Sequence, residues 1–315
     1  MTNPLLTQWD TPHGLPPFDR ITDADFKPAV EVALQEARDA IDAIAAQSDA
    51  PTFQNTVEAL EVADRSLGRV LGVFYGVAGA DSNPAREALQ RDFAPMLSAH
   101  SSWVTEHAAL FERVDALWTM RADLDLSDEQ ARVLMLTRRG FVRAGAKLQG
   151  ESASRLRDVK SRLSVIGTEF TQNLLADERE WFMPLDAEAM GSLPEFVQAT
   201  ARAAGAEKDA GGPVVTLSRS LIVPFLQFCD HRPLRQKAYE AWVSRGANGG
   251  KTDNRALAAE TLALRAERAQ LLGYDSFADY KLETEMAGTP DAVRGLLMNV
   301  WKPAKEAAEA DAKVL

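Results

Sequence analysis

The side chains that could bind a metal or activate water are few in this chain of 315 residues. Four histidines are scattered along it, each followed by a residue other than glutamate: His13, His100, His107 and His231. A helical zinc-peptidase motif, His-Glu-x-x-His, needs two histidines four residues apart and a glutamate that activates the metal-bound water. Because the motif is absent, we expect no catalytic residue and no metal ligand within these residues, and the sequence assigns no substrate-binding residue.

The other candidates for chemistry have simple structural interpretations. His100 and His107 lie about 10.5 Å apart along a helix, which is too far for one ion. Cys229 is the only cysteine and has no histidine-based activating setting, so we interpret it as a small buried apolar residue. Glu283 and Glu285 form an acidic pair, but paired carboxylates act only when they converge in space. A solvated helix face is the preferred interpretation of this pair.

The overall charge excludes some classes of partner. The chain has 46 acidic and 35 basic residues and a formal charge of -11. Such a surface repels phosphate backbones and anionic lipids, so we expect neither nucleic acid nor membrane as a partner. A single cysteine allows no internal disulfide, which fits a reducing compartment. The start of the chain has neither the basic segment nor the apolar run of a signal peptide, so we expect a cytoplasmic protein.

Hydrophobic periodicity predicts long helices through most of the chain. Between residues 26 and 44, apolar residues recur at three- and four-residue steps and predict one buried face. A similar pattern runs from Thr56 to Gly79. Within it, Gly68, Gly72 and Gly76 form a ridge without side chains, which predicts the close approach of a neighbouring helix. Apolar residues between 156 and 174 predict another long helix that packs along a seam.

Two short β-prone segments interrupt this helical pattern. Residues 181–185 (WFMPL) and 214–217 (VVTL) are separated by a stretch rich in glycine. We therefore predict a mainly α protein of long packed helices with a small β element near residues 180–220. A helical period returns from Pro290, and the chain stops within it, without a C-cap glycine or a polar tail. We interpret the chain as a fragment. The sequence does not show why it ends at Leu315.

Several segments taken together resemble one family of enzymes. These segments are 3–6 (NPLL), 16–21 (PPFDRI), 50–56 (APTFQNT), 110–118 (LFERVDALW), 141–148 (FVRAGAKL), 264–274 (LRAERAQLLGY), 278–280 (ADY) and 286–290 (MAGTP). Through them, the chain is similar to the peptidyl-dipeptidase branch of the thimet oligopeptidase and oligopeptidase A family of zinc metallopeptidases. No single segment is diagnostic. Together, however, they occur in the order found in the family and are spread over nearly the whole chain, which makes the resemblance specific.

The resemblance implies both a fold and an activity. It implies a helical, two-lobed enzyme with a deep channel, which cleaves short peptides and releases C-terminal dipeptides. It also implies zinc held by His-Glu-x-x-His and a later glutamate, all outside these 315 residues. On this basis, residues 1–225 would form an N-terminal helical domain that lines one side of the channel. Residues 226–315 would begin the peptidase domain and stop before the zinc motif.

Two functional hypotheses follow for the chain itself. The first is the N-terminal half of a peptidyl-dipeptidase, inactive alone, whose partner is the missing C-terminal peptidase lobe. The second is an inactive helical module that binds peptides or a partner protein. Under the first hypothesis, the apolar face of the last helix, with Leu296, Leu297 and Trp301, should be exposed. Exposed apolar faces promote association, so we also expect the fragment to self-associate.

Overall fold

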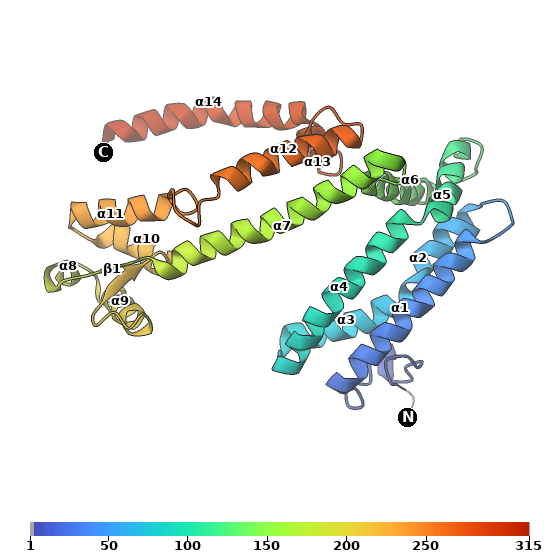
Figure 1. The fold of residues 1–315 in the computed structure, drawn as a ribbon, viewed down its shortest axis with the longest axis horizontal. Helices are drawn as coiled ribbons and strands as arrows, with labels where there is room; N and C mark the ends of the chain where they lie inside the picture. Colours follow the sequence, from blue (N-terminus) through green and yellow to red (C-terminus); the bar gives the residue numbers. More distant parts are fainter. Residues whose placement is uncertain (1–2, 315) are drawn as a thin grey trace. The chain divides into compact units, whose positions relative to one another are not determined.

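The computed structural model describes residues 3–314 and is mainly helical, as the sequence predicted (Figure 1). The chain divides into two compact units, one up to Gly150 and one from Glu151 on. This division reflects packing within the chain. The domain boundary predicted between residues 225 and 226 rests on the family resemblance, and it stays a prediction.

The first unit consists of helices joined by short loops. Its elements are η1 (Pro12–Gly14), α1 (Asp23–Ala45), η2 (Phe53–Glu58), α2 (Ala59–Ala63), α3 (Arg65–Ala80), α4 (Pro84–Glu106), α5 (Ala108–Met120) and α6 (Asp128–Ala144). Capping fixes several starts. The Thr52 hydroxyl accepts a bond from the backbone N–H of Asn55, and Ser127 caps α6 in the same way through Gln130.

Helix α1 packs through the face that its periodicity predicted. The residues of this face are all buried: Phe26, Val30, Ala33, Leu34, Ala37, Ile41 and Ile44. An aromatic cluster joins α1 to α3 and α4, with the ring of Phe74 5.1 Å from that of Phe26 and 4.9 Å from that of Phe93. Edge-to-face rings at these distances are favourable beyond their burial. The first unit is therefore organised around α1.

Among the residues that the structure describes, no helix packs closely against the glycine ridge of α3, so this prediction was wrong. A Cβ atom placed on Gly68, Gly72 or Gly76 would meet no atom within 4 Å. The reason is that α3 packs through another face, which includes Val70 and Phe74. The glycines instead border a hollow of about 510 Å³, together with aromatic and proline side chains from the first 18 residues. The predicted helix is also interrupted at Asp64, between α2 and α3.

The second unit begins with a long helix and contains the two strands. Its elements are α7 (Gly150–Glu180), β1 (Phe182–Pro184), α8 (Ala187–Gly191), α9 (Glu195–Glu207), β2 (Val214–Thr216), α10 (Arg219–Phe228), α11 (Arg232–Val243), α12 (Arg255–Leu271), α13 (Phe277–Leu282) and α14 (Pro290–Val314). The strands pair antiparallel, with Met183 opposite Val215. This pair confirms the predicted β element.

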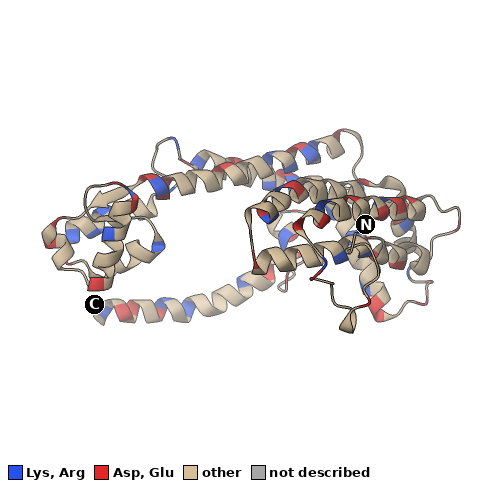
Figure 2. Ribbon diagram, turned by 90° about the horizontal axis from the view of Figure 1, so that it is seen from below, with Lys and Arg blue, Asp and Glu red and all other residues tan. Residues whose placement is uncertain are grey.

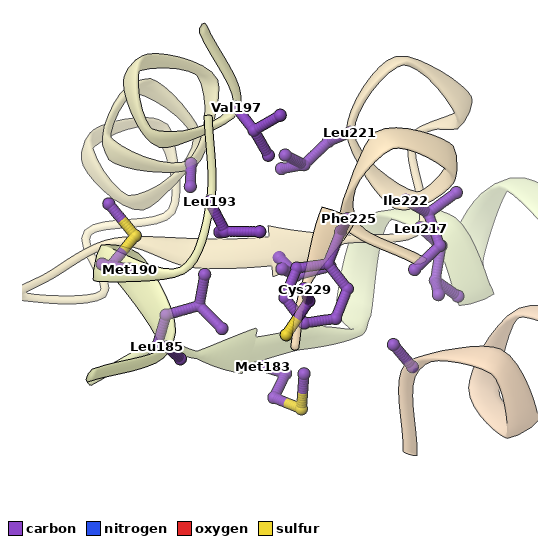
Figure 3. Close-up of a cluster of buried hydrophobic side chains, with 14 residues drawn as sticks. Met183, Leu185, Met190, Leu193, Val197, Leu217, Leu221, Ile222, Phe225 and Cys229 are labelled. Carbon is purple, nitrogen blue, oxygen red and sulfur yellow. The ribbon is translucent and has the colours of Figure 1, made fainter. Parts of the chain in front are cut away.

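The strand pair contributes side chains to a hydrophobic core. Met183 and Val215 are buried beneath α8, α9 and α10, together with side chains such as Leu193 and Phe225 (Figure 3). Gly205 on α9 lets the chain pass close by, because a Cβ atom there would lie 2.0 Å from the carbonyl oxygen of Gly212. The apolar residues that predicted the strands therefore fill this core, and a glycine between them allows the close packing of the chain.

Helix α14 lies along no apolar neighbour within the described residues. None of its residues is buried, although its first half carries large apolar side chains. The exposed fractions are 67% for Leu296, 60% for Leu297 and 61% for Trp301, in agreement with the expected exposure of this face. Charged residues gather toward its C-terminal end (Figure 2). Among residues 3–314, no helix combines the length and apolar character needed to cross a membrane.

Candidate functional site

The structure gives two of the histidines separate carboxylate partners. The Nε2 atom of His100, a buried residue, lies 3.1 Å from Oδ1 of Asp64. The Nε2 atom of His107 lies 3.1 Å from Oδ1 of Asp42, and its Nδ1 atom accepts a bond from the backbone N–H of Leu110. These side chains join helices of the first unit to one another. Their interpretation as surface or core residues therefore fits the structure.

The remaining histidines lie apart from them in sequence and setting. His231 comes within 3.7 Å of a carboxylate oxygen of Glu188 in the second unit. His13 lies in the short turn η1 with a positive φ of 60°. Within the part of the chain that the structure describes, each of these imidazoles thus has its own surroundings, and none belongs to a group of three or more side chains that could hold a metal ion.

The cysteine and the acidic pair have the simple roles expected for them. Cys229 is 2% exposed and belongs to the hydrophobic core that contains Met183 and Phe225 (Figure 3). Glu283 accepts a hydrogen bond from the hydroxyl of Tyr274 at 2.6 Å, whereas Glu285 pairs with Lys281 one turn before it. Because the two exposed carboxylates bind different donors, they do not form a catalytic pair.

The zinc implied by the resemblance was tested against the side chains present. Zinc in proteins is held by three or four histidine, cysteine or carboxylate ligands. In the part of the chain from residue 3 to residue 314, no group of three or more such side chains could hold a metal ion. The residues present therefore do not fit a zinc site, and we assign no hydrolytic step to them.

In the second unit, ion pairs and a small apolar cluster join α7 to α12, and we call this contact the seam. Arg155 forms a two-pronged ion pair with Glu267, with N···O distances of 2.6 and 2.8 Å. Arg162 does the same with Glu260, at 2.7 and 2.8 Å. The two helices are antiparallel, because the earlier arginine binds the later glutamate. Alongside the pairs, the buried side chains Val159, Ile166 and Leu264 pack together.

These ion pairs shift the titration of their carboxyl groups. The hydrogen bonds from Arg155 lower the pKa of Glu267 below its ordinary value, and those from Arg162 lower the pKa of Glu260. Sequence reasoning missed this seam, although a signal exists. The two arginines are seven residues apart on one helix, and the two glutamates are seven apart on another. Such matched spacing is typical of ion pairs along packed helices.

The loop before α12 is also fixed to α7. Asn254, only 2% exposed, donates a hydrogen bond to the carbonyl oxygen of Phe170 at 3.0 Å and accepts one from Asn173 at 2.8 Å. One helical turn further on, Asp177 accepts a bond from the backbone N–H of Gly246 at 2.7 Å. These bonds set the position at which α12 begins.

Comparison with known proteins identifies the family. The sequence profile of peptidase family M3 matches residues 225–315, which include α11 to α14. The chain is 33% identical over 310 residues to dipeptidyl carboxypeptidase of Salmonella typhimurium, an alignment that covers 97% of this chain and 45% of that protein. It is 32% identical over 316 residues to oligopeptidase A of Escherichia coli, covering 99% of this chain and 46% of that protein.

A plant protein extends the similarity beyond bacteria. The probable cytosolic oligopeptidase A of Arabidopsis thaliana is 25% identical over 320 residues, which cover 98% of this chain and 45% of that protein. The chain thus spans somewhat less than half the length of the relatives it matches. Nearly all of its residues align with them in order, and the resemblance seen in the sequence is confirmed. The chain belongs to peptidase family M3.

Proposed function

We propose that this chain is the N-terminal part of a zinc-dependent peptidyl-dipeptidase, an enzyme that hydrolyses short peptides and releases C-terminal dipeptides. The observation that carries the proposal is the alignment of 97% of the chain with less than half of a dipeptidyl carboxypeptidase. The rest of that relative's length is enough for a second lobe. Since the sequence has no His-Glu-x-x-His motif, the proposal places the zinc ligands on polypeptide outside these residues.

In this proposal, residues 1–225 form the helical wall of a substrate channel, and residues 226–315 begin the peptidase domain. The start of the family match at residue 225 supports that boundary. The chain contributes shape and substrate size limits, and the second lobe contributes the chemistry. The lone, buried Cys229 is consistent with a cytoplasmic location, which is part of the proposal.

The partner that we propose for the last helix is the C-terminal peptidase lobe. Side chains such as Leu296, Leu297 and Trp301 are more than half exposed, and helix faces of this kind are normally buried against another element. In the isolated chain, the same face would promote self-association. Short peptides are the substrates of the assembled enzyme.

The experiment compares this chain with a longer polypeptide that continues into a His-Glu-x-x-His segment. Both are incubated with an N-terminally blocked tetrapeptide, and released dipeptide is measured by mass spectrometry. We expect release only from the longer polypeptide, and its loss after chelation of the metal. Dipeptide release by residues 1–315 alone, or none by a folded, zinc-loaded longer form, would refute the proposal.

The second hypothesis, an inactive binding module, is favoured by one observation, the apolar surface left open on the second unit. It predicts that the chain is monodisperse, melts cooperatively and binds peptides without zinc, and that no longer form hydrolyses them. The dipeptide-release assay separates the two hypotheses, because only the first predicts turnover.

A further inference from the structure

A groove runs beside the seam of the second unit, and we call it the α7–α12 groove. It encloses about 600 Å³, within the size range of pockets that bind small ligands. Helices α7, α12 and α13, which lie next to one another in Figure 1, supply its walls. Its lining residues are Leu163, Ile166, Gly167, Phe170, Ala258, Thr261, Leu262, Arg265, Arg268 and Phe277.

Most of this lining is apolar and open. Leu262 is 67% exposed, an unusual position for a large apolar side chain beside a packed seam. On the opposite wall, a Cβ atom placed on Gly167 would meet no atom within 4 Å, so this side of the groove is free of protein atoms. The missing side chain leaves the backbone of α7 accessible to a ligand. The groove therefore offers space for an apolar group next to a bare stretch of helix.

Two arginines on α12 give the groove its charge. The guanidinium of Arg265 lies over the ring of Phe277, 5.0 Å from its centroid. That of Arg268 lies 4.9 Å from the ring centroid of Tyr280 and donates a hydrogen bond to its hydroxyl at 2.6 Å. Within residues 3–314, neither guanidinium forms an ion pair. In contrast, Arg155 on the adjoining seam binds a glutamate with two hydrogen bonds.

One donor of this pair lacks any partner. The Nε atom of Arg268 is buried and has no hydrogen-bond partner in the structure. A buried N–H without an acceptor is costly, and a carboxylate is the acceptor that an arginine binds most strongly. Arg265 and Arg268 both line this groove, and neither binds a carboxylate within residues 3–314. Their chemistry fits a ligand that is both anionic and apolar.

We propose that the α7–α12 groove binds the C-terminal end of a peptide, with the terminal carboxylate at Arg265 and Arg268 and an apolar last side chain against Leu163, Ile166 and Phe170. The inference rests on the proposed function, which makes peptides the substrates, and it names the part of the peptide that this half of the enzyme recognises. A single terminal carboxylate matches the two unpaired guanidiniums, whereas the apolar walls favour leucine or phenylalanine over glycine.

The first test measures binding by the chain of residues 1–315 without zinc. The probe is a fluorescent hexapeptide that ends in leucine with a free carboxylate, and binding is followed by fluorescence anisotropy. We expect the C-terminal amide of the same peptide to bind about 10-fold to 100-fold more weakly, the range expected for a lost hydrogen bond to a charged group. A peptide that ends in glycine should bind about 10-fold more weakly. Equal binding of the acid and the amide, or no binding, would overturn the inference.

The second test changes the groove itself. Gly167→Leu places a side chain on the open wall, where a Cβ atom meets nothing within 4 Å, and it should weaken binding of the free-acid peptide at least about 10-fold. Gly140→Leu is the matched control, because this helical glycine of the first unit also has free space around it. Arg265→Gln and Arg268→Gln should each reduce the preference for acid over amide, whereas Arg157→Gln on α7 should not. Loss of binding in the two controls, or none in the groove variants, would count against the groove.

The outcomes also separate this inference from the proposed function. If a longer polypeptide releases dipeptides but the groove variants bind peptide normally, only the groove inference fails. If the groove binds carboxylate peptides as expected but no longer form releases dipeptides, the proposed function fails and peptide binding remains. If acidic proteins bind the groove and free-acid peptides do not, the occupant is a protein surface and the inference is overturned.

Discussion

The apolar side chains of α14 should contribute little to the stability of the isolated chain, because they are largely exposed. Leu297 and Trp301 are 60% and 61% exposed, so about two-fifths of each side chain is covered within the chain. Complete burial of a large apolar side chain is worth about 1.5–3 kcal/mol. The double substitution Leu297→Gln and Trp301→Gln should therefore lower the unfolding free energy of the isolated chain by no more than about 2 kcal/mol in total. Burial of the remaining three-fifths of the two side chains would contribute about 2–4 kcal/mol, and only contact with a partner can provide this burial.

The assay pairs urea unfolding with sedimentation velocity over a range of protein concentrations. We expect the wild-type chain to associate as its concentration rises, and the double variant to remain a monomer with nearly unchanged unfolding. The control is Lys302→Gln and Lys305→Gln on the same helix, which should leave association intact. A clean wild-type monomer at high concentration would refute the reasoning. So would a variant that unfolds far more readily, because α14 would then be packed within the chain.

Gly72→Ala should raise the unfolding free energy by about 0.5–1 kcal/mol, since free space surrounds this helical glycine; a lower urea midpoint would contradict this. Gly205→Ala should instead lower the thermal midpoint, because its Cβ atom would meet the carbonyl oxygen of Gly212, and an unchanged midpoint would show that the loop adapts freely. Glu267→Gln removes a carboxyl whose pKa is lowered by Arg155. Its stabilisation is present above the unfolded pKa of about 4.3 and is lost as pH falls through the folded value, so the variant should be modestly less stable at pH 7 and equal to wild type near pH 2 in urea titrations.

Local patterns predicted the helices and the strand pair well, because the signals lie within each segment. The buried face of α1 follows directly from the three- and four-residue spacing of Phe26, Val30 and their successors. The pairing of Met183 with Val215 was recognisable from β-prone runs around a glycine-rich stretch. In each case, the side chains that create the pattern are the ones that pack.

Features that depend on distant segments were harder to predict. A glycine such as Gly72 leaves space on its helix, but the sequence does not show which part of the chain faces that space. In the structure, Gly72 borders a hollow rather than a neighbouring helix. The α7–α12 groove escaped prediction for the same reason. Phe170 and Arg268 come from helices far apart in sequence, and only their packing reveals an arginine without a carboxylate partner. The family, by contrast, was recognisable from ordered segments that need no structure.

The most direct measurement is the zinc content of the purified chain of residues 1–315, determined by inductively coupled plasma mass spectrometry after dialysis against zinc and then against buffer. Because residues 3–314 contain no group of three or more side chains that could hold a metal ion, the account predicts much less than one zinc ion per chain. One tightly held zinc ion per folded chain would contradict the claim that the metal site lies on other polypeptide.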